Sequence, residues 1–110
     1  METFLDSTSL LDDGPALAAR LERDGYLFIR GLLPVQAVKE VQARTLQKAY
    51  EGGWLDRDQP ASAGIANPDA ACKDPEPAYM DVFRHIWADE KLHRLRTHPD
   101  VLALFRRIFG

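Results

Sequence analysis

The residues of this sequence that come closest to a catalytic motif are His98, Pro99 and Asp100. A histidine and an aspartate in His-x-Asp spacing supply two ligands of the iron site that uses two histidines and one carboxylate. That site needs both side chains on one face of an extended strand and a second histidine far along the chain. Here Pro99 opens a pattern typical of a helix, and only residues 101–110 follow. We therefore interpret Asp100 as a carboxylate in a first helical turn, where it complements the helix dipole.

The other potential ligands are two histidines and one cysteine. His85 and His93 would lie roughly 12 Å apart on one unbroken helix, which is too far to share one metal ion. Cys72 is the only cysteine, so neither an internal disulfide nor a thiolate metal site can form. Its small neighbours are typical of a loop, and a nucleophilic role would need a partner histidine. The sequence therefore nominates no catalytic, cofactor-binding or metal-binding residue.

The tripeptide His98-Pro99-Asp100 has a second interpretation, because J-domain co-chaperones use the same three residues to stimulate their partner ATPase. In those proteins the tripeptide lies in an open loop, whereas the residues after Asp100 begin a helical pattern here. A tripeptide alone is a weak signal. A small helical protein-interaction module, or more narrowly a J-domain-like one, stays open as an alternative function.

Three aromatic residues, Tyr79, Phe83 and Trp87, recur at four-residue spacing. On a helix this spacing places their rings on one face, where they could stack against a ligand. Aromatic stripes of this kind are more often part of the core. We therefore interpret the three rings as core residues.

The composition is that of a folding sequence, with 45% hydrophobic and 28% charged residues. A length of 110 residues fits one domain or part of one. The net charge of -3 and the lack of any long block of like charges exclude a typical nucleic-acid footprint. No apolar run approaches the roughly 18 residues of a membrane span, and the N-terminus is acidic where a signal peptide is basic. We expect a cytoplasmic protein that binds neither nucleic acid nor membranes.

The first elements follow a polar lead over residues 1–13, which we expect to be flexible. Asp13-Gly14-Pro15 is a typical helix start and Gly25 a typical helix end, so a helix of about two to three turns lies between them. Residues Tyr26 to Arg30 are rich in aromatic and β-branched types and lie between glycines. This pattern predicts a strand with apolar side chains on both faces.

The remaining pattern is helical apart from one long loop. Pro34 opens the most regular helix of the chain, which ends at Gly52-Gly53. Residues 56–77 form a proline-containing loop, and loops of this length inside a domain are often functional. Further helices follow, with starts at Asp89 and His98. We expect these apolar positions of the C-terminal third to face inward: Tyr79, Val82, Phe83, Ile86, Trp87, Leu92, Leu95, Val101, Leu102, Phe105, Ile108 and Phe109.

Two segments resemble the N-terminal part of the phytanoyl-CoA dioxygenase family. Leu21 to Pro34, with the sequence LERDGYLFIRGLLP, is similar to a family opening in which a helix ends in Asp-Gly-Tyr. In that opening an apolar strand closes in Arg-Gly, and a proline-led helix follows. His98 to Gly110 is similar to a later family helix that ends in a glycine before the main sheet. The resemblance covers residues 16–55 and 79–110 and leaves the long loop unmatched.

The resemblance implies an iron(II) and 2-oxoglutarate dependent dioxygenase with a double-stranded β-helix, or jelly-roll. In the family, a His-x-Asp and a distant histidine hold the iron, and an arginine on a late strand binds 2-oxoglutarate. None of these positions has a counterpart in this sequence. We therefore expect residues 1–110 to be the N-terminal part of one such domain, α+β and mainly helical, with one early strand and the core sheet missing.

The family's reaction is the hydroxylation or related oxidation of a small or CoA-linked substrate. We expect the isolated chain to be inactive and to bind neither iron(II) nor 2-oxoglutarate, because it lacks the residues that hold them. An apolar strand without a partner also predicts self-association of the isolated chain.

Overall fold

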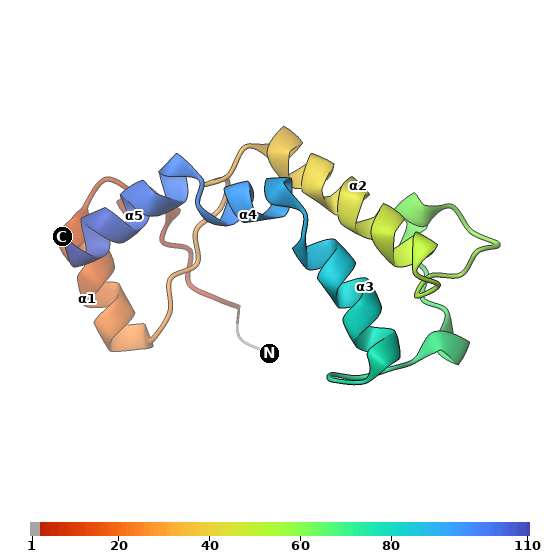
Figure 1. Ribbon diagram of the computed structural model, residues 1–110. Helices are drawn as coiled ribbons and strands as arrows, with labels where there is room; N and C mark the ends of the chain where they lie inside the picture. The colour runs from red at the N-terminus through yellow and green to blue at the C-terminus, as the bar shows by residue number, and fades with distance from the viewer. Residues whose placement is uncertain (1–2) are drawn as a thin grey trace. The chain divides into compact units, whose positions relative to one another are not determined.

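The computed structural model describes residues 3–110, which form two compact units. The first unit contains residues 3–35 and 96–110, and the second contains residues 36–95. Five α-helices lie in the described residues (Figure 1): α1 (Gly14–Asp24), α2 (Val35–Glu51), α3 (Pro77–Trp87), α4 (Glu90–Arg96) and α5 (Pro99–Phe109). Three short 3-10 helices are η1 (Thr8–Leu10), η2 (Ala61–Ala63) and η3 (Pro68–Ala70).

Helix α1, in the first unit, begins and ends where the sequence predicts. The Asp13 carboxylate accepts a hydrogen bond from the Ala16 N–H at 3.1 Å and caps the helix. Gly25 ends it with a left-handed φ of 78°, a conformation that side chains with a Cβ rarely adopt. Leu17 is fully buried in this unit, in which α1 packs against α5. Both predicted helix limits are confirmed.

The strand predicted at residues 26–30 is wrong. Phe28 forms one isolated parallel bridge with Asp6, in which the Ser7 N–H donates to the Phe28 carbonyl at 2.8 Å. The Arg30 N–H donates to the Thr8 hydroxyl oxygen at 2.8 Å. It therefore bonds to a side chain and not to the backbone of a neighbouring strand. A strand needs a neighbouring strand that forms backbone hydrogen bonds with it over several residues. Within residues 3–13 of the lead, Asp6 alone forms a bridge to this segment. Residues 1 and 2 lie outside the described part.

The expected α+β fold class, with an early jelly-roll strand, is therefore wrong. Residues 3–110 contain no sheet, and their other bridge, Leu55 with Ala66, is also isolated. Two aromatic side chains of residues 26–30 contact the lead instead. The Phe4 ring packs on Tyr26 and Phe28 with centroid distances of 4.9 and 6.0 Å. Aromatic contact therefore replaces the sheet that the composition of this segment predicted.

Helix α5 carries apolar side chains on more than one side. Its covered side consists of Val101, Leu104 and Ile108. The prediction that Leu102, Phe105 and Phe109 face inward is wrong, because all three are exposed, Phe105 to 53% and Phe109 to 68%. Positions 101, 104 and 108 share one helix face, and the exposed set lies about 100° around the axis.

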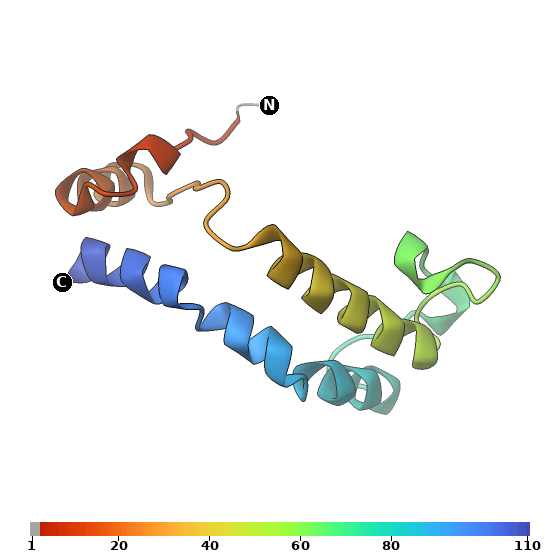
Figure 2. The same ribbon diagram turned by 90° about the horizontal axis from the view of Figure 1, so that it is seen from above.

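Helix α2, the longest helix, follows Pro34 directly and is succeeded by Gly52 and Gly53, as predicted. Val41 and Ala49 are its buried residues. Both views show the loop leaving the C-terminal end of α2 and returning to the start of α3 (Figures 1 and 2). No helix of residues 3–110 combines the length and the apolar character that a membrane span requires.

Candidate functional site

Four aromatic rings form a column in the second unit: Trp54, Tyr79, Phe83 and Trp87. Successive ring centroids are 5.7, 5.6 and 5.8 Å apart, and successive planes are inclined by 29°, 14° and 13°. Such ring pairs attract each other beyond the effect of burial. The aromatic stripe predicted on α3 is confirmed. Its interpretation as core is wrong for Trp87, which is 43% exposed.

Trp54 joins the column from outside α3, because the end of α2 directs it there. Helix α2 ends in a Schellman motif. The Trp54 N–H donates to the Ala49 carbonyl at 3.0 Å, and the Gly53 N–H donates to the Tyr50 carbonyl at 3.1 Å. Gly53 has a left-handed φ of 82°, which glycine adopts without a Cβ penalty. The indole is therefore positioned by a local backbone turn.

The preceding glycine, Gly52, has a different role, because it lets α3 approach the end of α2. A Cβ at Gly52 would lie 2.5 Å from Cγ2 of Val82, much closer than atoms can pack. One turn further along α3, the Lys48 ammonium donates to the His85 carbonyl at 3.2 Å. The glycine pair thus brings the two elements of the aromatic column together.

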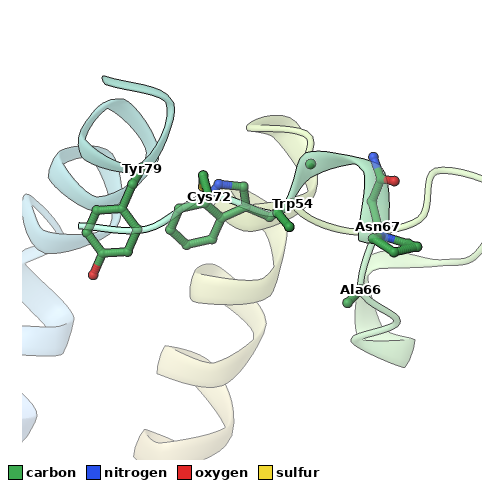
Figure 3. Close-up of a pocket in the computed structure, with 8 residues that line it drawn as sticks. Trp54, Ala66, Asn67, Cys72 and Tyr79 are labelled. Atoms are coloured by element: carbon green, nitrogen blue, oxygen red, sulfur yellow. The ribbon is translucent and has the colours of Figure 1, made fainter. Parts of the chain in front are cut away.

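A pocket of about 300 Å³ lies at the Trp54 end of the column (Figure 3). Its lining consists of Trp54, Ala66, Asn67, Pro68, Ala70, Ala71, Cys72 and Tyr79. No aspartate, glutamate, lysine, arginine or histidine is among these residues. One wall is therefore aromatic and the other is a loop of small residues, so the pocket suits an uncharged, mainly apolar ligand.

Asn67 ties the loop wall to the aromatic wall. Its backbone N–H donates to the Trp54 carbonyl at 2.8 Å, and its side-chain Nδ2 donates to the Gly53 carbonyl at 3.2 Å. Its Oδ1 accepts from the Asp69 N–H at 3.1 Å and caps η3. Both polar ends of the carboxamide are thus engaged within the protein. Asn67 holds the shape of the pocket.

At the other end of α3, the Asp89 side chain is only 3% exposed and joins α2 to the start of α4. Its Oδ2 lies 2.8 Å from Arg44 Nε and 3.5 Å from Lys48 Nζ. Its Oδ1 accepts from the Lys91 N–H at 3.0 Å, which confirms the predicted helix cap. No local sequence pattern predicts the two cationic partners.

These contacts lower the pKa of Asp89 to about 2. The hydrogen bond from Arg44 is the largest cause, and burial opposes it. The Lys91 N–H and the charges of Arg44 and Lys48 act in the same direction as that bond. The same ion pair raises the pKa of Arg44. Asp89 is therefore an ionised carboxylate at neutral pH that links α2 to the start of α4.

The structure gives His98 and Asp100 a structural role at the start of α5. His98 Nδ1 accepts a hydrogen bond from the Asp100 N–H at 3.1 Å, so the helix-cap interpretation is confirmed. Asp100 Oδ2 lies 3.7 Å from the same nitrogen. The tripeptide thus begins a helix and is not the open loop of a J-domain.

The structure places His85, His93 and Cys72, the other potential ligands, in different surroundings. Residues 3–110 contain no group of three histidine, cysteine, aspartate or glutamate side chains that could hold a metal ion. His85 Nε2 lies 3.7 Å from a Glu51 carboxylate oxygen. His93 Nε2 contacts the Trp87 carbonyl, and its ring packs edge-on against the indole at 4.8 Å. Cys72, half-buried, lies in the pocket wall.

Comparisons with protein-family models, with curated proteins and with solved structures find no match. The functional interpretation therefore rests on the geometry above and on the resemblance of the two sequence segments. The four-residue spacing predicts the three rings of α3, but it does not predict that Trp54 joins them. The signal that could have found it is the glycine pair at the end of α2, which directs the next residue back toward a packed neighbour.

Proposed function

We propose that this chain is a helical, non-catalytic part of an iron(II) and 2-oxoglutarate dependent oxygenase similar to the phytanoyl-CoA dioxygenases. The segment from Leu21 to Pro34 carries the proposal, since it resembles the family opening. Helix α1 ends at left-handed Gly25 directly before Tyr26, and α2 begins after Pro34. Both limits agree with the helices that the resemblance implies on either side of the segment.

In this proposal the oxygenase hydroxylates a small or CoA-linked substrate in the cytoplasm. Iron(II) and 2-oxoglutarate would be bound by residues outside this chain. The helices of this chain would support that catalytic part, and the loop of residues 56–77 would lie at its substrate entrance. The assignment of the loop is supported by its length, since long loops often carry function.

The coding sequence that follows the Gly110 codon tests the proposal. We expect a His-x-Asp, a histidine many residues later and then an arginine, because iron needs two imidazoles and a carboxylate while the keto acid needs a forked cation. A stop codon after Gly110 in relatives that match from Leu21 onward would contradict the proposal.

Calorimetric titration gives an independent test on the protein itself. The isolated chain, titrated anaerobically with iron(II) in the presence of 2-oxoglutarate, should show no saturable heat. A stoichiometric site tighter than about 10 μM, equivalent to roughly 7 kcal/mol, would refute a non-catalytic role.

The exposed side of α5 supports a second candidate function, a helical protein-interaction module. Leu102, Phe105 and Phe109 are exposed, and the two phenylalanine rings stack at 6.1 Å. Exposed apolar surface of this kind promotes association. Sedimentation of the isolated chain should therefore show self-association, and the double variant Phe105→Glu/Phe109→Glu should reduce it. A monomer at all concentrations would remove the support for this candidate.

A further inference from the structure

The aromatic column of the second unit has an end at Trp54. Tyr79 and Phe83 each stack with a ring on both sides, whereas Trp54 stacks with Tyr79 alone among the described residues. In Figure 3, Trp54 lies between Tyr79 and the segment that contains Ala66 and Asn67. The pocket is lined by both Trp54 and Tyr79, so a planar molecule in it would meet aromatic surface at the end of the column.

The size and chemistry of the pocket restrict what this molecule can be. A dry cavity of about 150 Å³ already admits benzene, so about 300 Å³ has room for one or two rings. The lining holds no charged side chain that could offset the desolvation of an ionic ligand. The Asn67 carboxamide is engaged at both ends, and the Tyr79 hydroxyl points away from the other labelled residues (Figure 3).

We propose that this pocket is a binding site for a neutral, planar aromatic molecule of one or two rings that stacks on Trp54. The contact consists of the indole, the small loop residues and the ring of Tyr79. Ring stacking and apolar burial supply the affinity. The hydrogen bonds of Asn67 to Gly53, Trp54 and Asp69 keep the pocket formed. The site contains no residue of the segment from Leu21 to Pro34, on which the proposed oxygenase function rests, so it can be tested separately from that function.

Indole is a suitable probe, and the chain contains its own internal reference. The sequence has two tryptophans, Trp54 at the pocket and Trp87 at the other end of the column. Titration of the ¹⁵N-labelled chain should shift the Trp54 Nε1–H resonance and the amides of residues 66–72, and leave the Trp87 Nε1–H resonance in place. For a shallow site and a small ligand, we expect a dissociation constant on the order of 1 mM.

Two variants and a matched control locate the site. Ala71→Leu fills the pocket from an exposed, extended position, and Tyr79→Leu removes one aromatic wall. Each should weaken indole binding by about 10-fold, the equivalent of one lost ring contact or a blocked pocket. Trp87→Leu removes a ring of the same column away from the pocket and should leave the affinity unchanged. Equal losses in all three variants would overturn the proposal.

Three further probes test the ligand class. Benzyl alcohol should shift the same resonances until the site is fully occupied. Cyclohexylmethanol, its non-aromatic analogue, and benzoate, an anionic analogue, should each bind about 10-fold more weakly. Equal binding of the saturated probe would overturn the stacking mode, and equal binding of benzoate would overturn the neutral class. A lack of saturable shifts with indole up to its solubility limit would overturn the site itself.

Discussion

The contacts inside the first unit differ in kind from those inside the second unit. In the first unit, α1 packs against α5 around Leu17, and Phe4 covers part of residues 26–30. In the second unit, a buried carboxylate with two cationic partners, a close approach at Gly52 and a column of rings join α2 to α3 and α4.

The first unit also exposes more large hydrophobic residues than the second unit. The large exposed hydrophobic residues of the first unit are Phe4, Leu5, Val35, Leu102, Phe105 and Phe109. Those of the second unit are Val38, Ile65 and Trp87. Contacts such as the Asp89 cluster specify one arrangement of their helices. In the first unit, α1 packs against α5, and the side of α5 with Leu102, Phe105 and Phe109 stays exposed.

Among these tests of the difference between the units, replacement of Leu17 should change the free energy of unfolding most. Leu17→Ala should lower the free energy of unfolding by about 3 kcal/mol, because it opens a cavity at a fully buried position. Hydrogen exchange should accelerate in α1 and α5 more than in α3. Leu102→Ala makes the same chemical change on the exposed side of α5 and should cost less than about 0.5 kcal/mol. Equal costs would contradict the burial pattern of the first unit.

The glycine contact of the second unit gives the next largest effect. Gly52→Ala should destabilise the protein by about 2 kcal/mol, because the new methyl group overlaps Val82. Val82→Ala removes the overlapping atoms, so the double variant should lose less than the sum of the two single variants in chemical denaturation. Additive losses would show that the close approach at Gly52 does not limit the packing of α2 on α3.

Acid should weaken the second unit through Asp89. The folded-state pKa of about 2 lies below the ordinary 3.8, so the unfolded chain binds more protons between these values. Stability therefore rises with pH across this window, is complete above it, and is lost as pH falls through about 2. Asp89→Asn should flatten the pH dependence of the urea midpoint there, while the exposed control Asp69→Asn should not. An unchanged acid response of Asp89→Asn would refute the ionic role.

The smallest effect should come from an exposed ion pair of the same unit. Glu40 contacts the Lys91 ammonium with both side chains about half exposed. Glu40→Gln should change the free energy of unfolding by about 0.5 kcal/mol or less, since solvent screens such pairs. The small difference should shrink further in high salt. A loss comparable to that of Gly52→Ala would mean that this exposed ion pair contributes as much to stability as the close contact at Gly52.

Much of the helical structure could be predicted from the sequence, because helix ends are local. The caps at Asp13, Asp89 and His98 bond to backbone groups two or three residues away. The end of α2 likewise depends on Gly53, whose turn involves only neighbouring residues. Such signals are complete within one short segment. The candidate site was predicted in part, since the spacing of the α3 rings is also a local pattern.

The sequence by itself determined where helices begin and end and which residues share a helix face. Tertiary structure alone decided that residues 26–30 form no strand, since a strand exists only with a partner along its length. It also decided which apolar side of α5 is covered, because both sides have helical periodicity and α1 covers one. The partnership of Asp89 with Arg44 joins residues 45 positions apart. Contacts between distant residues depend on how helices pack, which local patterns do not specify.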